Sequence, residues 1–561
     1  MDPALPAYLL AAVVVLILLR RLQVRLRLSR AKHPSLRGHS KMARRVARRV
    51  PFYELSGEAF FRCDGAPGEV ARKRREGFER LAGELRQRAP ASIEATEAIE
   101  PDVSDLQFIN AYRVPFQFRN RVRAELKLGH IATETSGTRI KDADGNWAYD
   151  LSGSYGVNVF GYDFYKECLD EGFEQARALG PVLGPYHPVV GDNVTRLKAI
   201  SGLDEVSFHM SGTEAVMQAV RLARYHTGRS HLVRFCGAYH GWWDGVQPGV
   251  GSQRAVNDVY TLKDMDDDTL RVLRTRNDIA CVLVSPLQAL HPNSGAPGDA
   301  TLVASDRACH FDRSAYTEWL LQVRAVCSER GIALIFDEVF SGFRLAFGGA
   351  QEYFGIDADL VTYGKTLGGG LPVGVLCGRR DLMKRYREDR PTDICFARGT
   401  FNAHPYVMTA MNAFLRRLEQ PELRDSYAGL EATWDRRTAS LNAALTERDL
   451  PVRVDNMVSV LSVRFTRPGR YNWMLQFYLR AHGLVLGWTG TGRLIMSHNF
   501  TDEDFRAATD RFVAAAEAMR EDGWWWAPEG LTNKAIKRQV LREMLAAWAG
   551  RRQAATALPR A

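Results

Sequence analysis

Two apolar runs that each end in a charged residue constrain this chain most. Residues 333–336 are continuously apolar, which is typical of a strand buried on both faces of a parallel sheet, and Asp337 follows them. A second run, residues 360–363, ends in a glycine and then Lys365, in a glycine-rich stretch. Ligands of open α/β sheets bind at the carboxyl ends of strands. The pattern therefore predicts a site that contains Asp337 and Lys365.

A carboxylate and an amine in these positions suit a cofactor with a basic ring nitrogen and an aldehyde. Pyridoxal phosphate is such a cofactor, because a lysine forms its Schiff base and an acid keeps its pyridine nitrogen protonated. The alternative is that Asp337 and Lys365 belong to a solvated rim of the sheet. The glycines around them favour the cofactor site.

The segments FDEVFSGFR and GGAQEYFGIDADLVTYGKTLGGGLPVG resemble the core of class III pyridoxal-phosphate aminotransferases. They are most similar to the glutamate-1-semialdehyde 2,1-aminomutase branch, and the similarity extends roughly from residue 113 to residue 500. The resemblance implies an α/β protein of fold type I, with a mostly parallel central sheet, helices on both faces and a smaller α+β domain from both chain ends. It also implies that Val339 presses on one face of the cofactor ring.

The sequence SGTE at residues 211–214 opens a helix after a short strand-like run. Ser211 and Glu214 form an S-x-x-E capping box, which explains the pair without any ligand. The same turn directs backbone N–H groups and a helix dipole outward, an arrangement that holds phosphate. The resemblance assigns that role to Ser211, Gly212 and Thr213.

The segment GAYHGWWD, residues 237–244, is similar to the family motif GxYHG. The resemblance implies that Tyr239 stacks on the pyridine ring, with His240 beside it. Such stacking needs an aromatic side chain, and flanking glycines allow close approach. Without the family, a core tyrosine with a hydrogen-bonded polar neighbour is the more common explanation of the pair.

Two further cofactor contacts come from the resemblance alone. Relatives usually have Glu-Pro after the strand at residues 279–285, but this chain has Ser-Pro-Leu-Gln, so Gln288 is a substitute donor to the phenolic oxygen. In relatives the Gly-Thr of the loop at residues 398–401 reaches the phosphate of the neighbouring subunit. Thr400 in that role predicts a homodimer.

The substrate side is predicted from the first part of the similar region. Arg113 either meets a substrate carboxylate or packs on nearby aromatic residues. Residues 138–151 have an Asp-Gly turn between two strand-like runs, which predicts a hairpin. Ser154 and Tyr155, in the loop that follows, are expected to line the pocket. Residues 291–311 are an inserted surface loop or a lid.

Composition limits the remaining possibilities. The chain has 561 residues, of which 46% are hydrophobic, enough for a large core. Residues 20–49 contain twelve Lys and Arg and no Asp or Glu, so the rest of the chain has a net charge of −2 (+10 less 12). A nucleic-acid partner is therefore not expected. Eight scattered cysteines without a CxxC pair suit a reducing compartment and no structural zinc or other metal.

The amino terminus suggests a membrane anchor. Residues 5–19 are uncharged and apolar, and arginines follow them, which predicts a single-pass helix with its amino terminus outside and the catalytic domain cytoplasmic. The alternative is an amphipathic helix that is buried or lies in the membrane interface. In either membrane-bound arrangement the basic segment up to residue 49 would lie against lipid headgroups.

The expected organisation has six parts. These are an anchor with its basic segment (1–49), a helical lead-in (50–100), the first part of the small domain (101–165), the large cofactor-binding domain (166–400), the rest of the small domain (401–522) and a Trp-rich amphipathic extension (523–561). The extension either packs on the parent domain or lies in a membrane interface.

These observations favour a membrane-associated enzyme that moves an amino group from a small-molecule donor onto an aldehyde or ketone. Two alternatives stay open. The first is an intramolecular aminomutase of the glutamate-1-semialdehyde type. The second is a membrane-tethered scaffold without catalysis, which the joint presence of Asp337, Lys365, Tyr239 and the phosphate turn disfavours.

Overall fold

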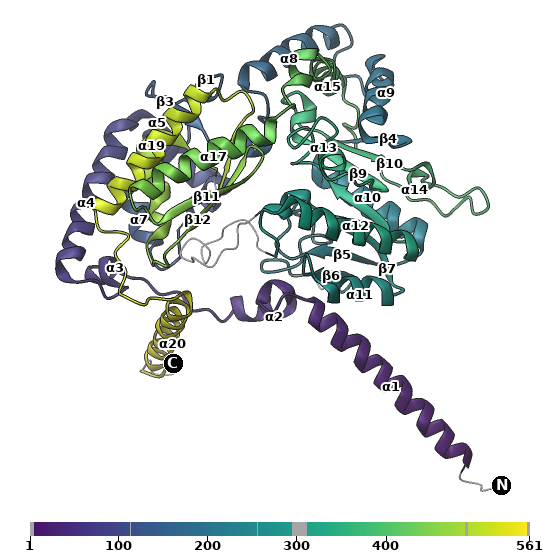
Figure 1. Cartoon of the computed structure of the whole chain (residues 1–561), viewed down its shortest axis with the longest axis horizontal. Coiled ribbons are helices and arrows are strands. Elements are labelled where there is room, and N and C mark those ends of the chain that lie inside the picture. The colour runs from purple at the N-terminus through teal and green to yellow at the C-terminus, as the bar shows by residue number, and fades with distance from the viewer. Residues whose placement is uncertain (1–4, 113, 255, 294–310, 488–491, 558–561) are drawn as a thin grey trace.

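The structure is a computed structural model and describes residues 5–112, 114–254, 256–293, 311–487 and 492–557. Figure 1 shows two lobes, with helix α1 extending away from them. One lobe contains a seven-stranded sheet, and the other contains two small sheets together with helices from both ends of the chain. The predicted domain boundaries stay predictions.

The seven-stranded sheet has the order β4-β10-β9-β8-β7-β5-β6. Only β10 is antiparallel to its neighbours, so the sheet is mostly parallel, as predicted. Its strands are β4 (Glu205–His209), β5 (His231–Phe235), β6 (Val259–Leu262), β7 (Ile279–Val284), β8 (Ala333–Asp337), β9 (Leu360–Gly364) and β10 (Gly374–Gly378).

Helices cover both faces of this sheet. Successive side chains of a strand point to opposite faces. On β8, Phe336 belongs to the same buried cluster as Trp319 of α12, whereas Ile335 belongs to the cluster of Val216 of α10. Every residue of β7, β8, β9 and β10 is buried, which explains their continuous apolar sequences.

The smaller sheets have the orders β1-β2-β3-β13 and β11-β12-β14. The predicted hairpin is confirmed, because β2 pairs with β3 across the Asp-Gly turn. The strands are β1 (Glu134–Ser136), β2 (Arg139–Lys141), β3 (Trp147–Asp150), β11 (Val452–Met457), β12 (Val460–Phe465), β13 (Leu484–Val485) and β14 (Arg493–Ile495).

The α-helices surround these sheets and form both extensions. In chain order they are α1 (Leu5–Ala31), α2 (Ser40–Ala47), α3 (Glu58–Arg62), α4 (Gly68–Arg88), α5 (Pro90–Ile99), α6 (Ser104–Tyr112), α7 (Arg119–Glu125), α8 (Tyr162–Ala176), α9 (Val189–Ser201), α10 (Gly212–Thr227), α11 (Asp267–Thr275), α12 (Arg313–Arg330), α13 (Gly349–Phe354), α14 (Arg380–Met383), α15 (Pro405–Leu418), α16 (Pro421–Asp425), α17 (Leu430–Glu447), α18 (Leu475–Ala481), α19 (Asp502–Glu521) and α20 (Asn533–Ala557).

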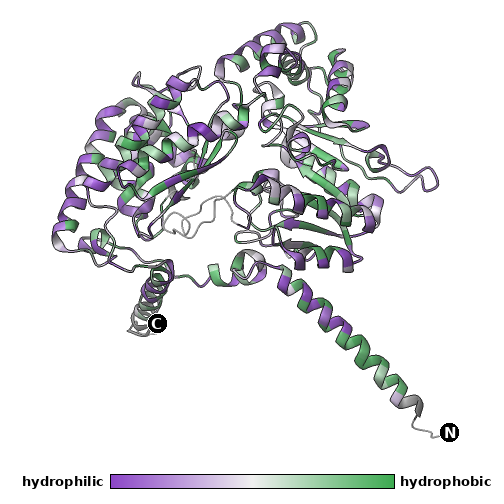
Figure 2. Cartoon of the chain, in the orientation of Figure 1, coloured by the Kyte–Doolittle hydropathy of each residue, from purple (hydrophilic) through white to green (hydrophobic). Residues whose placement is uncertain are grey.

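The prediction of an amino-terminal membrane helix is wrong. The apolar run does form a helix, and Figure 2 shows its hydrophobic half at the end farthest from the lobes. However, α1 continues through Arg20, Arg21, Arg25, Arg27 and Arg30. Among the residues that the structure describes, no helix combines the length and the apolar character that a bilayer crossing requires.

The basic segment after α1 contacts the large lobe. The backbone N–H of Lys263 donates to the carbonyl of Ala31 at 2.9 Å. Arg44 of α2 donates to the carbonyls of Ser252 and Arg254, at 2.9 and 3.0 Å. Arg44, from the basic amino-terminal segment, therefore holds the loop that follows residues 237–244.

The carboxyl-terminal extension packs on the rest of the chain, which was one of the two outcomes expected for it. Ile536 is buried, and Glu543 of α20 forms a two-pronged ion pair with the buried Arg470, at 2.9 and 3.0 Å. The hydroxyl of Tyr53, in the lead-in before α3, also donates to Glu543, at 2.8 Å. One carboxylate thus joins the carboxyl-terminal extension to the lead-in and to the smaller lobe.

Replacing Glu543 by Ala should lower the free energy of unfolding by about 3 kcal/mol, because it leaves the Arg470 guanidinium buried without its partner. Denaturant unfolding monitored by circular dichroism measures the loss. Glu447→Ala is the control, since Glu447 is exposed and, among the described residues, its ion pair is with the partly exposed Arg448. The control should change the free energy by less than about 0.5 kcal/mol. Equal effects of the two substitutions would contradict the anchoring role of Glu543.

Candidate active site

The predicted site residues meet where Val339 packs between two glycines. A Cβ atom added to Gly212 would lie 2.6 Å from Val339 Cγ1, and one added to Gly364 would lie 3.2 Å from the same atom. Gly212 opens α10, and Gly364 precedes Lys365. The turn predicted to hold phosphate, the residue predicted to face the ring and the predicted lysine are therefore close neighbours.

Asp337, the last residue of β8, is buried and well supplied with hydrogen-bond partners. Its Oδ2 atom is 2.7 Å from Nδ1 of His240, which is almost completely buried. Its Oδ1 atom accepts from the Thr362 hydroxyl at 3.2 Å and from the Val339 N–H at 3.3 Å. The pKa of His240 is lowered because burial disfavours its charged form, and the hydrogen bond to Asp337 opposes this shift only in part. These partners fix the orientation of the carboxylate.

Lys365 begins a short 3₁₀ helix (Lys365–Gly368) with a left-handed backbone, φ 50°. Its side chain is partly buried, and its Nζ atom lies 4.5 Å from the centre of the Phe340 ring. Desolvation of the amine lowers the pKa of Lys365 to about 8, although the charge of Asp337 acts in the opposite direction. A substantial fraction of this amine is therefore neutral near physiological pH, unlike that of an exposed lysine.

The turn before α10 has the geometry expected of an anion cradle. The Ser211 hydroxyl caps the helix by accepting from the Glu214 N–H, at 3.3 Å. The Glu214 carboxylate accepts from the N–H of Met210, one residue before the cap, at 2.9 Å. The predicted capping pair is thus present, except that the Glu214 carboxylate accepts from the N–H of Met210 instead of that of Ser211. Thr213 is packed closely, because a Cβ atom on Gly241 would lie 2.4 Å from its hydroxyl oxygen.

Tyr239 and Gln288 differ in how they are held. Tyr239 is 63% exposed, so its ring face is accessible to a planar ligand. Gln288 lies in a 3₁₀ helix after β7 (Pro286–Leu290), where its amide donates to the carbonyls of Cys236 and His291 at 3.0 and 3.3 Å. Donation to a cofactor oxygen would compete with these two bonds.

The loop after β3 comes close to Lys365. A Cβ atom on Gly156 would lie 3.5 Å from Lys365 Cδ. Ser154 and Tyr155 both have left-handed backbones, with φ of 45° and 57°. The Tyr162 hydroxyl is 2.9 Å from the Ser154 hydroxyl and donates to the buried Asp150 at 2.8 Å. The predicted position of this loop on the substrate side is consistent with these contacts.

Two further predicted residues, Arg113 and Thr400, have no observed contact with this cluster among the described residues. Arg113 is outside the described residues. Thr400 lies in an exposed turn closed by a hydrogen bond from Asn402 N–H to the Gly399 carbonyl, at 3.4 Å. Of the predicted surface loop or lid at residues 291–311, only residues 291–293 and 311 are described.

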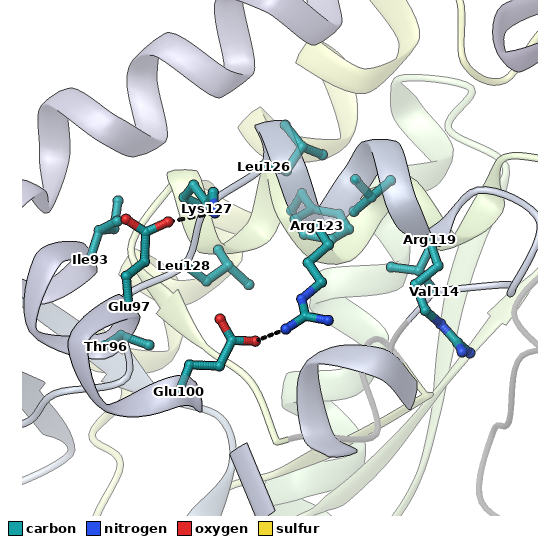
Figure 3. Close-up of a pocket in the computed structure, with 12 residues that line it drawn as sticks. Ile93, Thr96, Glu97, Glu100, Val114, Arg119, Arg123, Leu126, Lys127 and Leu128 are labelled. Atoms are coloured by element: carbon teal, nitrogen blue, oxygen red, sulfur yellow. Dashed lines mark hydrogen bonds and ion pairs between the residues drawn. The ribbon is translucent and has the colours of Figure 1, made fainter. Parts of the chain in front are cut away.

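A separate cavity of about 50 Å³ lies between α5 and α7, in the smaller lobe (Figure 3). Ion pairs at its rim join Arg123 to Glu100 and Lys127 to Glu97. It is lined by Ile93, Thr96, Glu97, Glu100, Val114, Arg119, Val122, Arg123, Leu126, Lys127, Leu128 and Phe477. This lining contains none of the predicted site residues, and the volume is close to that of one or two water molecules.

Comparison with known proteins identifies the family. A family model described as Aminotransferase class-III matches residues 122–255 and 312–516, more than half of the chain. The chain belongs to the class III aminotransferases. It is therefore a pyridoxal-phosphate-dependent enzyme of fold type I, and the resemblance seen in the sequence is confirmed.

This class III aminotransferase is 33% identical over 391 residues to the glutamate-1-semialdehyde 2,1-aminomutase of Nitratidesulfovibrio vulgaris, with 67% of this chain and 89% of the relative covered. The same-named protein of Alkaliphilus oremlandii is 29% identical over 438 residues, covering 73% and 96%. A solved transaminase with bound PLP is 26% identical, with a TM-score of 0.58 and coverage of 70% and 92%. A glutamate-1-semialdehyde aminomutase from Pseudomonas aeruginosa has a TM-score of 0.64, covers 80% and 99%, and at 19% identity shares the fold.

The residues of this class III aminotransferase fit pyridoxal phosphate. Lys365 supplies a partly neutral amine, Asp337 supplies a buried carboxylate, and the helix start at Gly212 supplies N–H groups for phosphate. Sequence reasoning did not find the contacts of Asp337 with His240 and Thr362, or that of Phe340 with Lys365. The only signal for the His240 contact was its place next to Tyr239.

The lowered pKa of Lys365 predicts how capture of the cofactor by the cofactor-free protein depends on pH. Only the neutral amine attacks an aldehyde, so the capture rate should rise about tenfold per pH unit below pH 8 and level off above it. Stopped-flow absorbance after mixing with pyridoxal phosphate measures the rate. Pyridoxal phosphate and N-acetyl-lysine amide provide the reference reaction. A protein midpoint near the ordinary lysine value of 10.5 would contradict the desolvation of this amine.

Proposed function

We propose that this enzyme transfers an amino group from a small-molecule donor to a separate aldehyde or ketone acceptor. The observation that carries the proposal is the amine of Lys365, with a pKa of about 8, in the same cluster as the buried carboxylate of Asp337. An amine with a pKa near the working pH can both accept and return a proton, as the two halves of a transamination require.

The roles of the residues follow from their contacts. Bound pyridoxal phosphate supplies a ring that accepts the electron pair left when a proton leaves the substrate carbon. Asp337, oriented by His240 and Thr362, holds a negative charge for the ring nitrogen. Lys365 takes the proton from the substrate carbon and later returns it.

The remaining predicted residues bind and orient. The N–H groups at Ser211, Gly212 and Thr213 receive the phosphate, supported by the start of α10 at that turn. Val339 supports one face of the ring and Tyr239 stacks on the other. Gln288, Ser154 and Tyr155, together with Arg113, complete the predicted set around cofactor and substrate.

An intramolecular aminomutase is a second candidate. Its support is the name of the curated relatives in Nitratidesulfovibrio vulgaris and Alkaliphilus oremlandii. The two candidates differ in what leaves the enzyme. A transferase without an acceptor releases one carbonyl product per active site, whereas a mutase returns an isomer of its substrate.

The first test supplies the loaded enzyme with a panel of amino donors and no acceptor. We expect one donor to yield its carbonyl compound in an amount equal to the enzyme, measured by mass spectrometry, with further product after addition of an acceptor. Formation of isomer alone would contradict the transferase and support the mutase. Lys365→Ala should lower the rate by about 10³-fold or more and abolish the visible absorbance of the attached cofactor. Lys384→Ala, at an exposed lysine paired with Glu388, should leave both unchanged.

We also propose that the enzyme acts as a homodimer. Five large apolar side chains are about half exposed or more on segments that carry predicted site residues, which is typical of a surface covered by another protein. They are Tyr155, Tyr239, Trp242, Phe396 and Phe401. Thr400 lies in the same exposed segment as two of them, as a residue that serves a neighbouring site would.

A mixing experiment tests whether the dimer shares its sites. Thr400→Asp should repel the phosphate in the neighbouring site, and Lys365→Ala inactivates its own site. Each variant alone should be nearly inactive. After joint unfolding and refolding of equal amounts, we expect about a quarter of the native activity, because half of the dimers are hybrids with one intact site. An inactive mixture of correctly sized dimers would contradict the shared site.

A further inference from the structure

Phe340 is the aromatic residue that contacts the reacting amine. It follows Val339 in the segment after β8, and its ring is centred 4.5 Å from Lys365 Nζ. The guanidinium of Arg344 lies 5.5 Å from the same ring centre. Phe340 is only partly buried, in contrast to core phenylalanines such as Phe336 and Phe343. Part of the Phe340 side chain is therefore accessible from outside the core, while its ring lies against the lysine amine.

The backbone of Gly156 fixes Phe340 on one side. A Cβ atom on Gly156 would lie 2.6 and 2.7 Å from two carbons of the Phe340 ring and 3.5 Å from Lys365 Cδ. Gly156 also has a positive φ of 96°, which other residues rarely adopt. The glycine thus allows close contact between the ring and the loop, and the contact leaves the ring no room to move toward the loop.

The loop itself is held in place. Asp150 accepts hydrogen bonds from Ser152 and Gly153 N–H groups, at 2.8 and 3.1 Å, and from Tyr162, which also contacts Ser154. Two residues with unfavourable backbone angles persist only where surrounding contacts maintain them. The wall against which Phe340 rests is therefore rigid.

We propose that Phe340 is a specificity-determining residue that limits the size of the groups on the substrate carbon next to the reacting nitrogen. The space beside Lys365 then accepts amines and carbonyl compounds with one unbranched substituent at that carbon and excludes those with bulky or branched substituents. This inference deepens the proposed function and rests on it for the identity of the substrates.

The first test measures size selection in turnover. Wild type, Phe340→Leu and Phe340→Ala are compared with two donors, propylamine and 1-phenylethylamine, each with pyruvate as acceptor. The ratio of kcat/KM for the bulky donor over the small donor should rise about tenfold or more in Phe340→Ala, with Phe340→Leu between. Phe347→Ala is the control, because Phe347 is also a partly buried phenylalanine and its ring contacts the Arg424 guanidinium. An unchanged ratio in folded Phe340 variants would overturn the proposal.

A second test needs no transaminase activity. In the cofactor-free protein, an aldehyde condenses with the Lys365 amine with loss of water, and cyanoborohydride reduces the product to a stable secondary amine. Acetaldehyde and 2,2-dimethylpropanal compete for the amine, and peptide mass spectrometry gives the ratio of the two adducts on Lys365. Phe340→Ala should raise the share of the bulky adduct about tenfold. Phe340→Leu, which disrupts packing less, should raise that share by a smaller factor and shows the effect in case Phe340→Ala does not fold.

The two tests separate the possible failures. If wild type turns over no donor while the adduct ratio changes as expected, the proposed function fails and the role of Phe340 at the amine stands. If turnover occurs and neither ratio changes, the role of Phe340 is overturned and the function stands. Phe340 could instead only stabilise the charge of the lysine amine. Removing its ring would then shift the pH dependence of adduct formation by about half a pH unit and leave the adduct ratio unchanged. That result would also overturn the size limit.

Discussion

The rest of the site depends on holding the Asp337 carboxylate in a buried place. Burial of a carboxylate is unfavourable unless hydrogen bonds or an opposite charge compensate for the lost water. The fold supplies these bonds from His240, which follows β5, and from Thr362 on β9. Because the sheet order brings these segments to one edge, partners far apart in sequence converge on one acid.

The same sheet edge explains why the sequence pointed to Asp337 and Lys365. A strand buried on both faces must be apolar throughout, so β8 and β9 were visible as runs that end at Asp337 and Lys365. The structure adds a packing reason for two of the glycines in these predicted turns. Gly212 and Gly364 are where Val339 approaches the backbone closely, and only glycine leaves that space.

Features that depend on long-range packing could not be predicted in this way. Nothing in the local sequence shows that Phe340 lies over Lys365 or that His240 contacts Asp337, because these contacts join separate segments. The amino-terminal prediction failed for a different reason. The apolar run of residues 5–19 is shorter than the roughly 20 residues of a spanning helix, and α1 continues into arginines instead of ending there.

Several of the non-glycine residues with left-handed backbones belong to the segments of the site, which the sequence did not show. Lys365, Ser154, Tyr155 and Phe343 all have positive φ values, although none is glycine. Such residues cost on the order of 1–3 kcal/mol each and need compensation from their surroundings. Part of that compensation comes from the buried cluster that includes Phe343 and from the bonds of Asp150. The contacts that compensate for this strain hold the loop beside the lysine, which a size-selective site requires.

Arg344 connects this site to the smaller lobe. It is fully buried and donates to the Ser459 hydroxyl and to the carbonyls of Met496 and Asn158, at 2.9, 2.7 and 3.0 Å. Burial lowers the pKa of Arg344 to about 10, so its charge is retained at neutral pH and its hydrogen bonds are charge-assisted. Its guanidinium also contacts the Phe340 ring. A shift of the smaller lobe would therefore disturb the aromatic wall beside Lys365, and the carboxyl-terminal extension, anchored by Glu543, stabilises the same lobe.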